Sequence, residues 1–229
     1  MICACARARG FSRLGLDADA VYVKAGIEGD EDCEQVIVVA PKSDLLASTP
    51  TVANAAVLGG MECFGGLSPA LNLDGSGGPF HLFQSEPSDG KASLVTITGP
   101  LHAPVMTRRD VATHALPSAP PAEQPAAQTQ KPGIRVFYSI TAASVLRHGT
   151  IWSVETVGHK DRAAIRWLEV DPKSATVVHE GLITDPQLHL YNASIAVNEF
   201  GNVVIACNGS SVSQFVGISC RRRRDRCLR

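Results

Sequence analysis

The fold is decided by residues 151–208, which read IWSVETVGHKDRAAIRWLEVDPKSATVVHEGLITDPQLHLYNASIAVNEFGNVVIACN. Here runs rich in Val, Ile, Trp and Thr alternate with short groups of Gly, Pro, Asn, Asp and Ser. This pattern is typical of short strands separated by tight turns and not of helices. It predicts five strands, at residues 151–157, 163–171, 176–182, 194–197 and 203–208.

Three turns are expected between these strands, at residues 158–161, 171–174 and 198–201. In the second turn, Asp171 can bond to the backbone and Pro172 presets φ. In the third, Gly201 is expected at a positive φ, which Phe200 would adopt only at a cost. The strands therefore form a meander.

The same residues predict burial. Residues 194–197 and 203–207 are small or apolar at consecutive positions, so we expect both faces of these strands to be covered. In residues 163–171 each face mixes polar and apolar side chains. Short four-stranded sheets that stack face to face around an axis have this property.

These segments resemble a family of uncharacterised microbial β-propeller proteins that is loosely sialidase-like. The resemblance lies in residues 151–154, 163–170, 191–198 and 201–205, and upstream in residues 20–23 and 36–45. Ala193 stands where the family has Pro. The resemblance spans residues 17–219 and implies an all-β fold. It implies an incomplete propeller of four-stranded antiparallel blades with long loops, with roughly three to four blades at about 40 to 50 residues each.

The upstream half is expected to continue the all-β pattern. The sequence predicts a hairpin of strands 21–25 and 35–40 around an acidic turn at 28–32, loops over the glycine-rich residues 58–78, and strands at 80–84, 93–98, 107–115 and 134–140. The acidic turn could hold calcium, but it lacks the Asp-x-Asp-x-Asp-Gly order, so we favour a solvated turn. The glycine-rich residues contain no phosphate-binding pattern.

Three segments depart from this pattern. Residues 1–16 contain arginines that interrupt the apolar core of a secretory signal, so we expect a disordered or misread tail rather than a signal peptide, with a transit peptide as the alternative. An extracytoplasmic location would then require a misannotated start. Residues 116–133 are Pro-rich and predict a long loop inside the propeller, with an interdomain linker as the alternative. Residues 220–229 form a basic tail, which we interpret as a frame change or truncation rather than an address or phosphate-binding segment.

Composition bounds the function. The chain has 229 residues, is 45% hydrophobic and carries a formal charge of −1. This charge gives no bulk reason to bind nucleic acid, and no apolar run approaches the ~20 residues of a membrane-spanning helix. The seven cysteines and seven histidines show no Cys-x-x-Cys or His-x-x-x-His spacing, so we expect no metal and no cofactor.

Two classes of function remain. The first is a non-catalytic propeller that binds a partner, either a carbohydrate or a protein. The second is a sialidase-like glycoside hydrolase, which needs an arginine cluster, a Tyr and acid pair and a proton donor. The residue types are available: Arg108, Arg109, Arg135, Arg147, Arg162 and Arg166, and Tyr22, Tyr138 and Tyr191. The Ser-x-Asp-x-Gly-x-Thr-Trp turn of sialidase blades is absent, so we favour the scaffold.

Four residues are individual site candidates. Arg166 and Trp167 could form a stacking platform for a sugar acid, although we favour a structural role in which they pack on opposite faces of their strand. Asn192 and Asn208 begin Asn-x-Ser triplets, which are glycosylation acceptors only if the chain is secreted.

Overall fold

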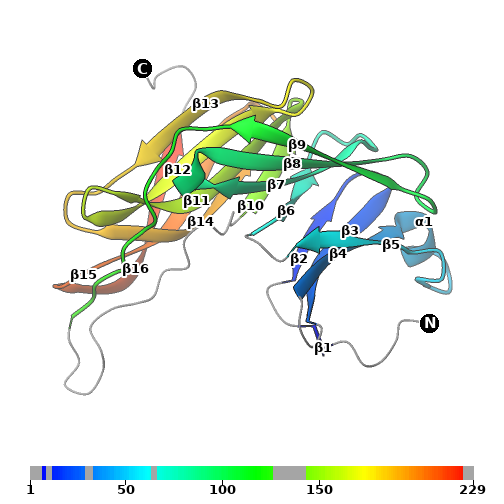
Figure 1. Cartoon of the computed structure of the whole chain (residues 1–229), viewed down its shortest axis with the longest axis horizontal. Coiled ribbons are helices and arrows are strands. Elements are labelled where there is room, and N and C mark those ends of the chain that lie inside the picture. The colour runs from blue at the N-terminus through cyan, green and yellow to red at the C-terminus, as the bar shows by residue number, and fades with distance from the viewer. Residues whose placement is uncertain (1–6, 9–11, 29–32, 63–65, 126–142, 224–229) are drawn as a thin grey trace.

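The computed structural model describes residues 7–8, 12–28, 33–62, 66–125 and 143–223, and these residues form an all-β protein (Figure 1). The all-β class predicted from the sequence is therefore confirmed. The only helical segments in the described part are the short α1 (Lys42–Leu45) and the 3-10 turn Pro87–Asp89.

The strands form four antiparallel meanders in chain order. Meander 1 contains β2 (Arg13–Leu16), β3 (Ala20–Glu28), β4 (Cys33–Pro41) and β5 (Ala56–Glu62), and the short β1 (Arg7–Ala8) continues β2 along β3. Meander 2 contains β6 (Ser68–Asn72), β7 (Phe80–Glu86), β8 (Lys91–Thr98) and β9 (Val105–Ala112). Meander 3 contains β10 (Ala143–Arg147), β11 (Thr150–His159), β12 (Arg162–Asp171) and β13 (Thr176–Ile183). Meander 4 contains β14 (His189–Val197), β15 (Val203–Ser211) and β16 (Gln214–Arg223).

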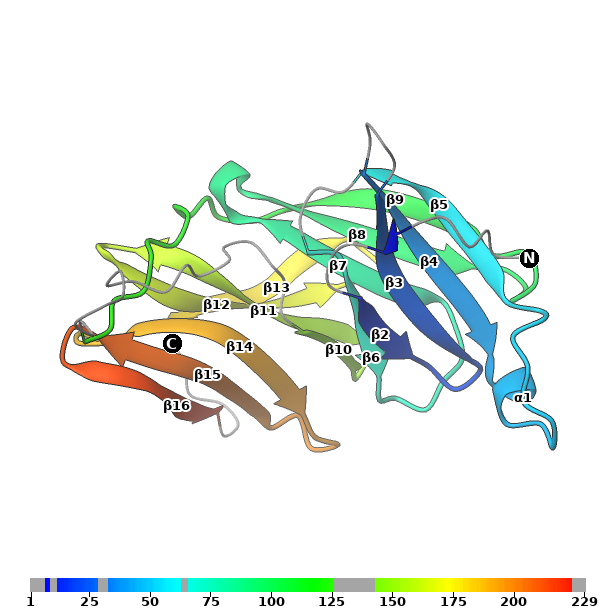
Figure 2. The ribbon, with the colours of Figure 1, turned by 90° about the horizontal axis from the view of Figure 1, so that it is seen from below.

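The first strands of the meanders hold the molecule together. β2 pairs with β6 in parallel, with Leu16 opposite Leu71, and β6 pairs with β10 in parallel, with Ala70 opposite Ser144. β14 lies beside β10, β11 and β12 without joining their sheet. Figure 2 shows β2, β6, β10 and β14 following one another across the molecule. Meanders 1 to 3 thus make one large mixed sheet, and meander 4 makes a second, small sheet.

Three apolar clusters of the core lie between neighbouring meanders, and a small fourth cluster packs Ala119 and Ala122 against Ala163 and Tyr191. Meanders 1 and 2 meet through Tyr22, Ile37, Val39, Phe80, Leu82, Val95 and Ile97. Meanders 2 and 3 meet through Phe83, Leu94, Val111, Leu146, Ile151, Leu168 and Val170. Meanders 3 and 4 meet through Trp152, Val154, Ile165, Trp167, Ile195, Val197, Val203 and Ile205. Each fully buried Ile, Leu or Val contributes about 1.5 to 3 kcal/mol, so these contacts fix the order of the meanders.

The expectation that both faces of residues 194–197 and 203–207 are covered is wrong, whereas β12 is the strand whose two faces are covered. In β12 nearly every residue is buried, because meanders 2 and 4 pack on its two faces. In β14 and β15, Ile195 and Ile205 are buried, but Val204 is 41% exposed and Ala196 is also exposed. In the described part of the chain, meander 4 packs against a neighbour on one face only.

The prediction of loops over the glycine-rich residues 58–78 is wrong in part, because these residues contain most of β5 and all of β6. β6 is held as a strand by backbone pairing with β2 on one side and β10 on the other. This pairing outweighs the preference of the neighbouring glycines for loops. Likewise, β9 begins at Val105 and ends at Ala112, earlier than the expected 107–115. The expected strand at 134–140 lies outside the described residues.

The segment boundaries also shift. β2 begins at Arg13, inside the expected tail of residues 1–16, because its backbone pairs with β3 on one side and β6 on the other. β16 continues through Arg223, so the first residues of the expected basic tail are paired with β15. Residues 116–125 form no strand, as expected for the Pro-rich loop, and residues 126–133 lie outside the described residues.

Candidate functional site

The loops that join the first and second strands of the four meanders lie next to one another, at residues 17–19, 73–79, 148–149 and 198–202. Ala18 N donates to Ser76 O over 3.2 Å, which links meanders 1 and 2. His148 Nε2 lies 2.9 Å from Glu199 O, which links meanders 3 and 4. We call these four loops the loop row. It is the place where all four meanders bring polar groups together.

Asp74 and Arg147 hold the middle of the loop row. Asp74 Oδ1 accepts a hydrogen bond from His148 N at 2.8 Å, and Oδ2 accepts one from Gly149 N at 2.9 Å. Arg147 donates to Leu73 O and, at 3.4 Å, to Asn198 O. Both side chains are occupied with backbone partners from neighbouring meanders. Their role here is therefore positional.

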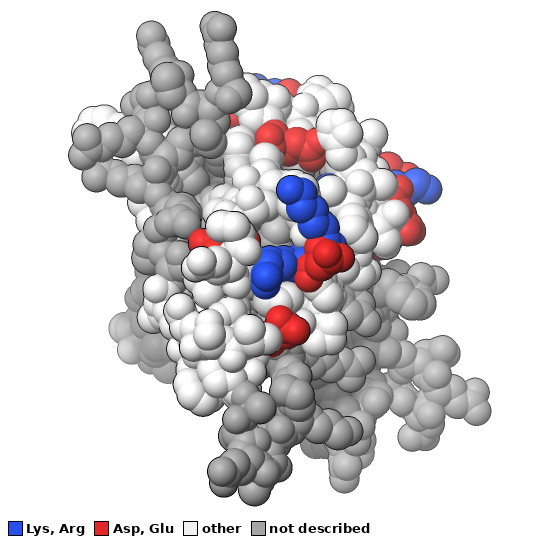
Figure 3. All heavy atoms as spheres, turned by 90° about the vertical axis from the view of Figure 1, so that its left-hand side faces the viewer, with Lys and Arg blue, Asp and Glu red and all other residues white. Residues whose placement is uncertain are grey.

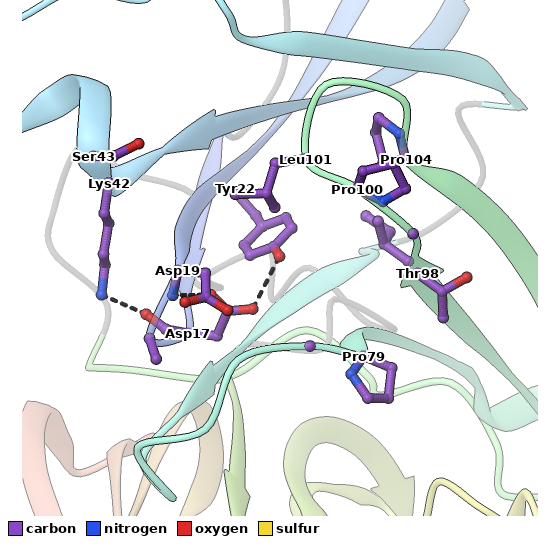
Figure 4. Close-up of a pocket in the computed structure, with 14 residues that line it drawn as sticks. Asp17, Asp19, Tyr22, Lys42, Ser43, Pro79, Thr98, Pro100, Leu101 and Pro104 are labelled. Atoms are coloured by element: carbon purple, nitrogen blue, oxygen red, sulfur yellow. Dashed lines mark hydrogen bonds between the residues drawn. The ribbon is translucent and has the colours of Figure 1, made fainter.

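Asp17 organises the first loop of the row (Figure 4). Its carboxylate is buried and accepts hydrogen bonds from Asp19 N and Ala20 N, both at 2.8 Å, and from the Tyr22 hydroxyl at 2.9 Å. Burial, together with the negative charge of Asp17, raises the pKa of Tyr22 far above its usual value. Tyr22 is therefore a neutral phenol that donates a hydrogen bond, which is the opposite of an activated nucleophile.

A pocket of about 630 Å³ opens beside this loop, between meanders 1 and 2. Its polar lining comes from Asp19, Lys42, Ser43 and Thr98, and its apolar lining from Tyr22, Pro79, Ile97, Pro100, Leu101 and Pro104. Figure 4 shows these side chains arranged around the opening, with elements of both meanders contributing. The volume falls in the range of ordinary small-molecule sites, ~300 to 1,000 Å³.

The ammonium group of Lys42 is held by the backbone of the first loop. Lys42 Nζ donates to Asp17 O, and Lys42 N donates to Asp19 O at 2.8 Å. Asp19 itself is exposed at the pocket. Its Oδ2 lies against the next loop, where a Cβ on Gly77 would be 1.8 Å away, so a larger residue at Gly77 would displace the Asp19 carboxylate. A carboxylate, an ammonium group and hydroxyls beside proline and leucine surfaces can bind a small polyhydroxylated molecule.

Arg166, a platform candidate from the sequence, is buried between meanders 2 and 3. Its Nε donates to Glu155 Oε1 at 2.5 Å, Nη1 to His114 O at 2.6 Å and Nη2 to Ser85 Oγ at 2.8 Å. Burial raises the pKa of Glu155, while the charge of Arg166 and its hydrogen bonds act in the opposite direction. Glu155 Oε2 has no hydrogen-bond partner among the described residues. Arg166 thus ties two meanders together.

Trp167, the other platform candidate, points to the opposite face of β12. It is 7% exposed and stacks with Trp152, with ring centroids 6.0 Å apart and planes 22° apart. Both rings belong to the cluster between meanders 3 and 4. The placement of Arg166 and Trp167 on opposite, covered faces favours the structural interpretation of this pair.

The remaining arginine and tyrosine candidates are dispersed. Arg108 donates to Ser93 Oγ at 2.6 Å, Arg109 donates to Lys173 O at 2.8 Å, and the Tyr191 hydroxyl donates to Ser210 Oγ at 3.1 Å. Arg162 lies at the far end of meander 3, while Arg135 and Tyr138 lie outside the described residues. Within the described chain, the structure therefore brings together a Tyr and an acid, Tyr22 and Asp17, but no cluster of arginines around them.

The two glycosylation candidates lie in meander 4. Asn192 is exposed at an irregularity of β14, with φ of 52°, and Asn208 is half-buried in β15.

A second hollow, of about 420 Å³, lies at the other end of meander 3. It is lined by the β11–β12 turn and the loop after β13, including Lys160, Asp161, Arg162 and Asp185. Figure 3, which views the molecule from the left of Figure 1, shows Lys and Arg side chains interspersed with Asp and Glu on a mostly uncharged surface. On the described part of this face, the basic side chains are not gathered into one patch.

Among the described residues, no three His, Cys, Asp or Glu side chains are placed to hold a metal ion together. The described chain also contains no helix with the length and hydropathy to cross a membrane. No protein-family model matches the sequence, and no curated protein is significantly similar to it.

Asp17, Asp19, Lys42 and Asp74 were not among the site candidates from the sequence. A signal for them exists in four similar segments, LGLDADAVYV from residue 14, LNLDGSGGPFHLF from residue 71, VLRHGTIWSV from residue 145 and IAVNEFGNVVIA from residue 195. Each has two or three apolar positions, a polar residue that begins a turn, and a new strand. A search for internal repeats would have aligned these turns and identified the loop row.

Proposed function

We propose that this chain is a non-catalytic binding scaffold built as an incomplete β-propeller of four blades, one for each meander. Antiparallel meanders that stack face to face, with their first strands side by side, support this interpretation. The loop row then lies at one end of the propeller axis. The ligand binds in the pocket at Asp19 and Lys42.

The observation that carries the non-catalytic proposal is the state of the Asp17 and Tyr22 pair. A sialidase-like reaction needs a tyrosine that becomes nucleophilic and an acid that exchanges protons with the substrate. Here the Asp17 carboxylate is saturated by three hydrogen bonds, and Tyr22 is 2% exposed with its phenol kept protonated. Both residues line the pocket, but the carboxylate accepts hydrogen bonds from the protein's own donors and the phenol donates to that carboxylate, which supports a non-catalytic role.

The ligand class that fits the pocket best is a neutral carbohydrate. Asp19 can accept hydrogen bonds from sugar hydroxyls, and Lys42, Ser43 and Thr98 can donate to sugar oxygens. Pro79 and Leu101 present apolar surface to the carbon face of a sugar ring. A sugar acid is a poorer fit, because the Asp19 carboxylate would oppose its charge.

Binding and turnover can be measured separately. Saturation-transfer NMR with a panel of neutral mono- and oligosaccharides should detect binding, which Asp19→Ala should weaken by about tenfold or more, since a charge-assisted hydrogen bond contributes roughly 1.5 to 3 kcal/mol. The control is Asp110→Ala, which removes an exposed carboxylate on β9, outside the pocket. Equal loss of binding in both variants would contradict the proposed site.

The alternative function is a glycoside hydrolase. The observation in its favour is that a tyrosine and an acid, Tyr22 and Asp17, lie within hydrogen-bond distance of each other. We expect no hydrolysis of fluorogenic sialosides or neutral glycosides. Turnover by the purified chain that Tyr22→Phe abolishes, while leaving the melting temperature unchanged, would establish the hydrolase and overturn the scaffold.

A further inference from the structure

The interface between meanders 1 and 2 and the interface between meanders 3 and 4 follow one packing rule. A sheet face made of aliphatic and aromatic side chains is covered by the corresponding face of the next meander, as in the cluster that joins Val39 to Leu82 and in the one that joins Ile165 to Ile205. Two sheet faces, one on meander 1 and one on meander 4, have the same composition but face away from this row of meanders. We call them end face 1 and end face 4.

End face 1 runs across all four strands of meander 1. Leu14, Val23, Val38 and Val57 stand opposite one another in adjacent strands, so their side chains share one face of the sheet. The neighbouring row, which includes Tyr22 and Val39, points the other way, into the cluster with meander 2. Leu14 is 56% exposed and Val57 is 57% exposed. A row that is wholly aliphatic across four strands is unusual for a surface that stays in water.

End face 4 is the outward side of meander 4. Ala196 stands opposite Val204, and Ser194 stands opposite Ala206, while the intervening Ile195 and Ile205 point inward to meander 3. Val204 is 41% exposed, and Ile218, on the outer strand β16, is 84% exposed. On β14 and β15 this face is made of small and apolar residues, and the register of β16 adds Ile218 opposite Asn208 and Arg222 opposite Val204 at its edge.

We infer that a second copy of this chain covers both end faces, end face 1 of each copy packing on end face 4 of the other, so that two copies close a ring of eight meanders. This inference rests on the proposed propeller. The end faces lie at opposite ends of the row of meanders, so one copy cannot bring its own two faces together without distorting the paired strands β2, β6 and β10. A two-fold axis through the ring lets both contacts form at once. Eight blades is within the range of natural propellers.

The buried area is sufficient for a stable dimer. A sheet face of three strands, with ~4.8 Å between strands and about seven residues at ~3.3 Å each, covers roughly 330 Å². The ring buries four such faces, which gives roughly 1,300 Å² of total area and lies within the ~1,200 to 2,000 Å² of specific interfaces.

Sedimentation velocity over a concentration series tests the inference on the full chain. The wild-type protein should be a dimer that does not grow further. Val204→Lys and Val57→Lys should each raise the dissociation constant by at least about tenfold, because each places an ammonium group in an apolar contact. Val178→Lys is the matched control: Val178 is 45% exposed on β13, outside both end faces, and its substitution should leave the dimer intact.

A mixing experiment tests which faces meet. A mixture of Val204→Lys and Val57→Lys contains one pairing with two intact faces, so it should form more dimer than either variant alone. A wild-type monomer, a series of growing oligomers, or sensitivity to only one of the two substitutions would each overturn the closed ring. Because the pocket lies inside one copy, carbohydrate binding by monomeric Val204→Lys is independent of this outcome, and failure of one proposal is distinguishable from failure of the other.

Discussion

At the scale of the residue, buried polar side chains link neighbouring meanders through hydrogen bonds and ion pairs. Arg166 is among the largest fully buried side chains and reaches Glu155, Ser85 and the backbone at His114. Removing one partner of such a pair leaves an uncompensated charge, which typically costs about 3 to 5 kcal/mol. Asp17 and Tyr22 form a second buried polar pair, in the wall of the pocket, where the Tyr22 hydroxyl donates to Asp17 Oδ2.

A pH prediction follows for His81, whose Nδ1 lies 3.2 Å from Thr96 Oγ1 on the face of meander 2 that packs against meander 3. Burial, with a smaller effect of the Arg109 charge, lowers the pKa of His81 to about 4. The unfolded residue titrates near 6.5, so between pH 6.5 and pH 4 the unfolded chain binds a proton that the folded protein does not. The free energy of unfolding is therefore highest above pH 6.5 and falls as the pH falls toward 4. The free energy of unfolding should fall by roughly 3 kcal/mol more between pH 7 and pH 4 in the wild type than in His81→Gln.

Urea unfolding at a series of pH values measures this difference, because carboxylates that titrate in the same range affect both proteins equally. Parallel pH profiles for the two proteins would show that His81 is protonated in the folded state as readily as in the unfolded chain.

At the scale of the element, the hairpin turns decide where strands end. The β14–β15 turn closes as expected: Gly201 has φ of 79°, its N–H donates to Asn198 O at 3.1 Å, and Asn198 Oδ1 accepts from Phe200 N and Asn202 N. In the expected turn at 158–161, the strand continues to His159 and Lys160 takes the positive φ. In the next turn Ala175 has the positive φ, 57°. There the Asp171 carboxylate accepts hydrogen bonds from Lys173 N and Ser174 Oγ, as its position at the start of the turn predicts.

Gly201→Val should lower the free energy of unfolding by roughly 1 to 3 kcal/mol, because a β-branched residue is strained at positive φ. A Cβ at this position would meet His148 only at 3.9 Å, so the cost is conformational rather than steric. Gly201→Asn is the control and should cost much less, since Asn tolerates the left-handed region. Thermal unfolding monitored by circular dichroism compares the variants, and a Val variant as stable as the Asn variant would refute the argument.

At the scale of the whole molecule, stability should fall from the middle of the row of meanders to its end. β12 pairs on both sides and is buried on both faces, whereas β16 pairs only with β15 and contains exposed Phe215, Val216 and Ile218. Amide hydrogen exchange should therefore be roughly a hundredfold or more slower in β12 than in β16, because β16 can open without disturbing the clusters between meanders. Exchange measured by mass spectrometry at peptide resolution gives both rates. Equal protection of the two strands would mean that the molecule opens only as one unit.

The sequence by itself determined the all-β class and the strands of the stretch from β11 to β15, whereas β5, β10 and β16 were not predicted. Alternating β-formers, Asp171-Pro172 and Gly201 act within a few residues of themselves, so local patterns were enough to predict the all-β class and the positions of β11 to β15. The same local reasoning failed for β2 and β6, whose few residues are held as strands by backbone pairing with distant neighbours.

Only the tertiary structure decided which groups meet. Asp17, Lys42 and Thr98 reach one pocket because three separate hairpins end at the same place, and Arg166 meets Ser85 across 81 residues of chain. Whether β14 and β15 are covered on one face or two was also settled by packing, since Val204 and Ile205 are equally apolar in the sequence but point to opposite sides of a sheet that has only one neighbour in the described structure. Propensity acts over a few residues, whereas burial and hydrogen bonding depend on segments that only the folded chain brings together.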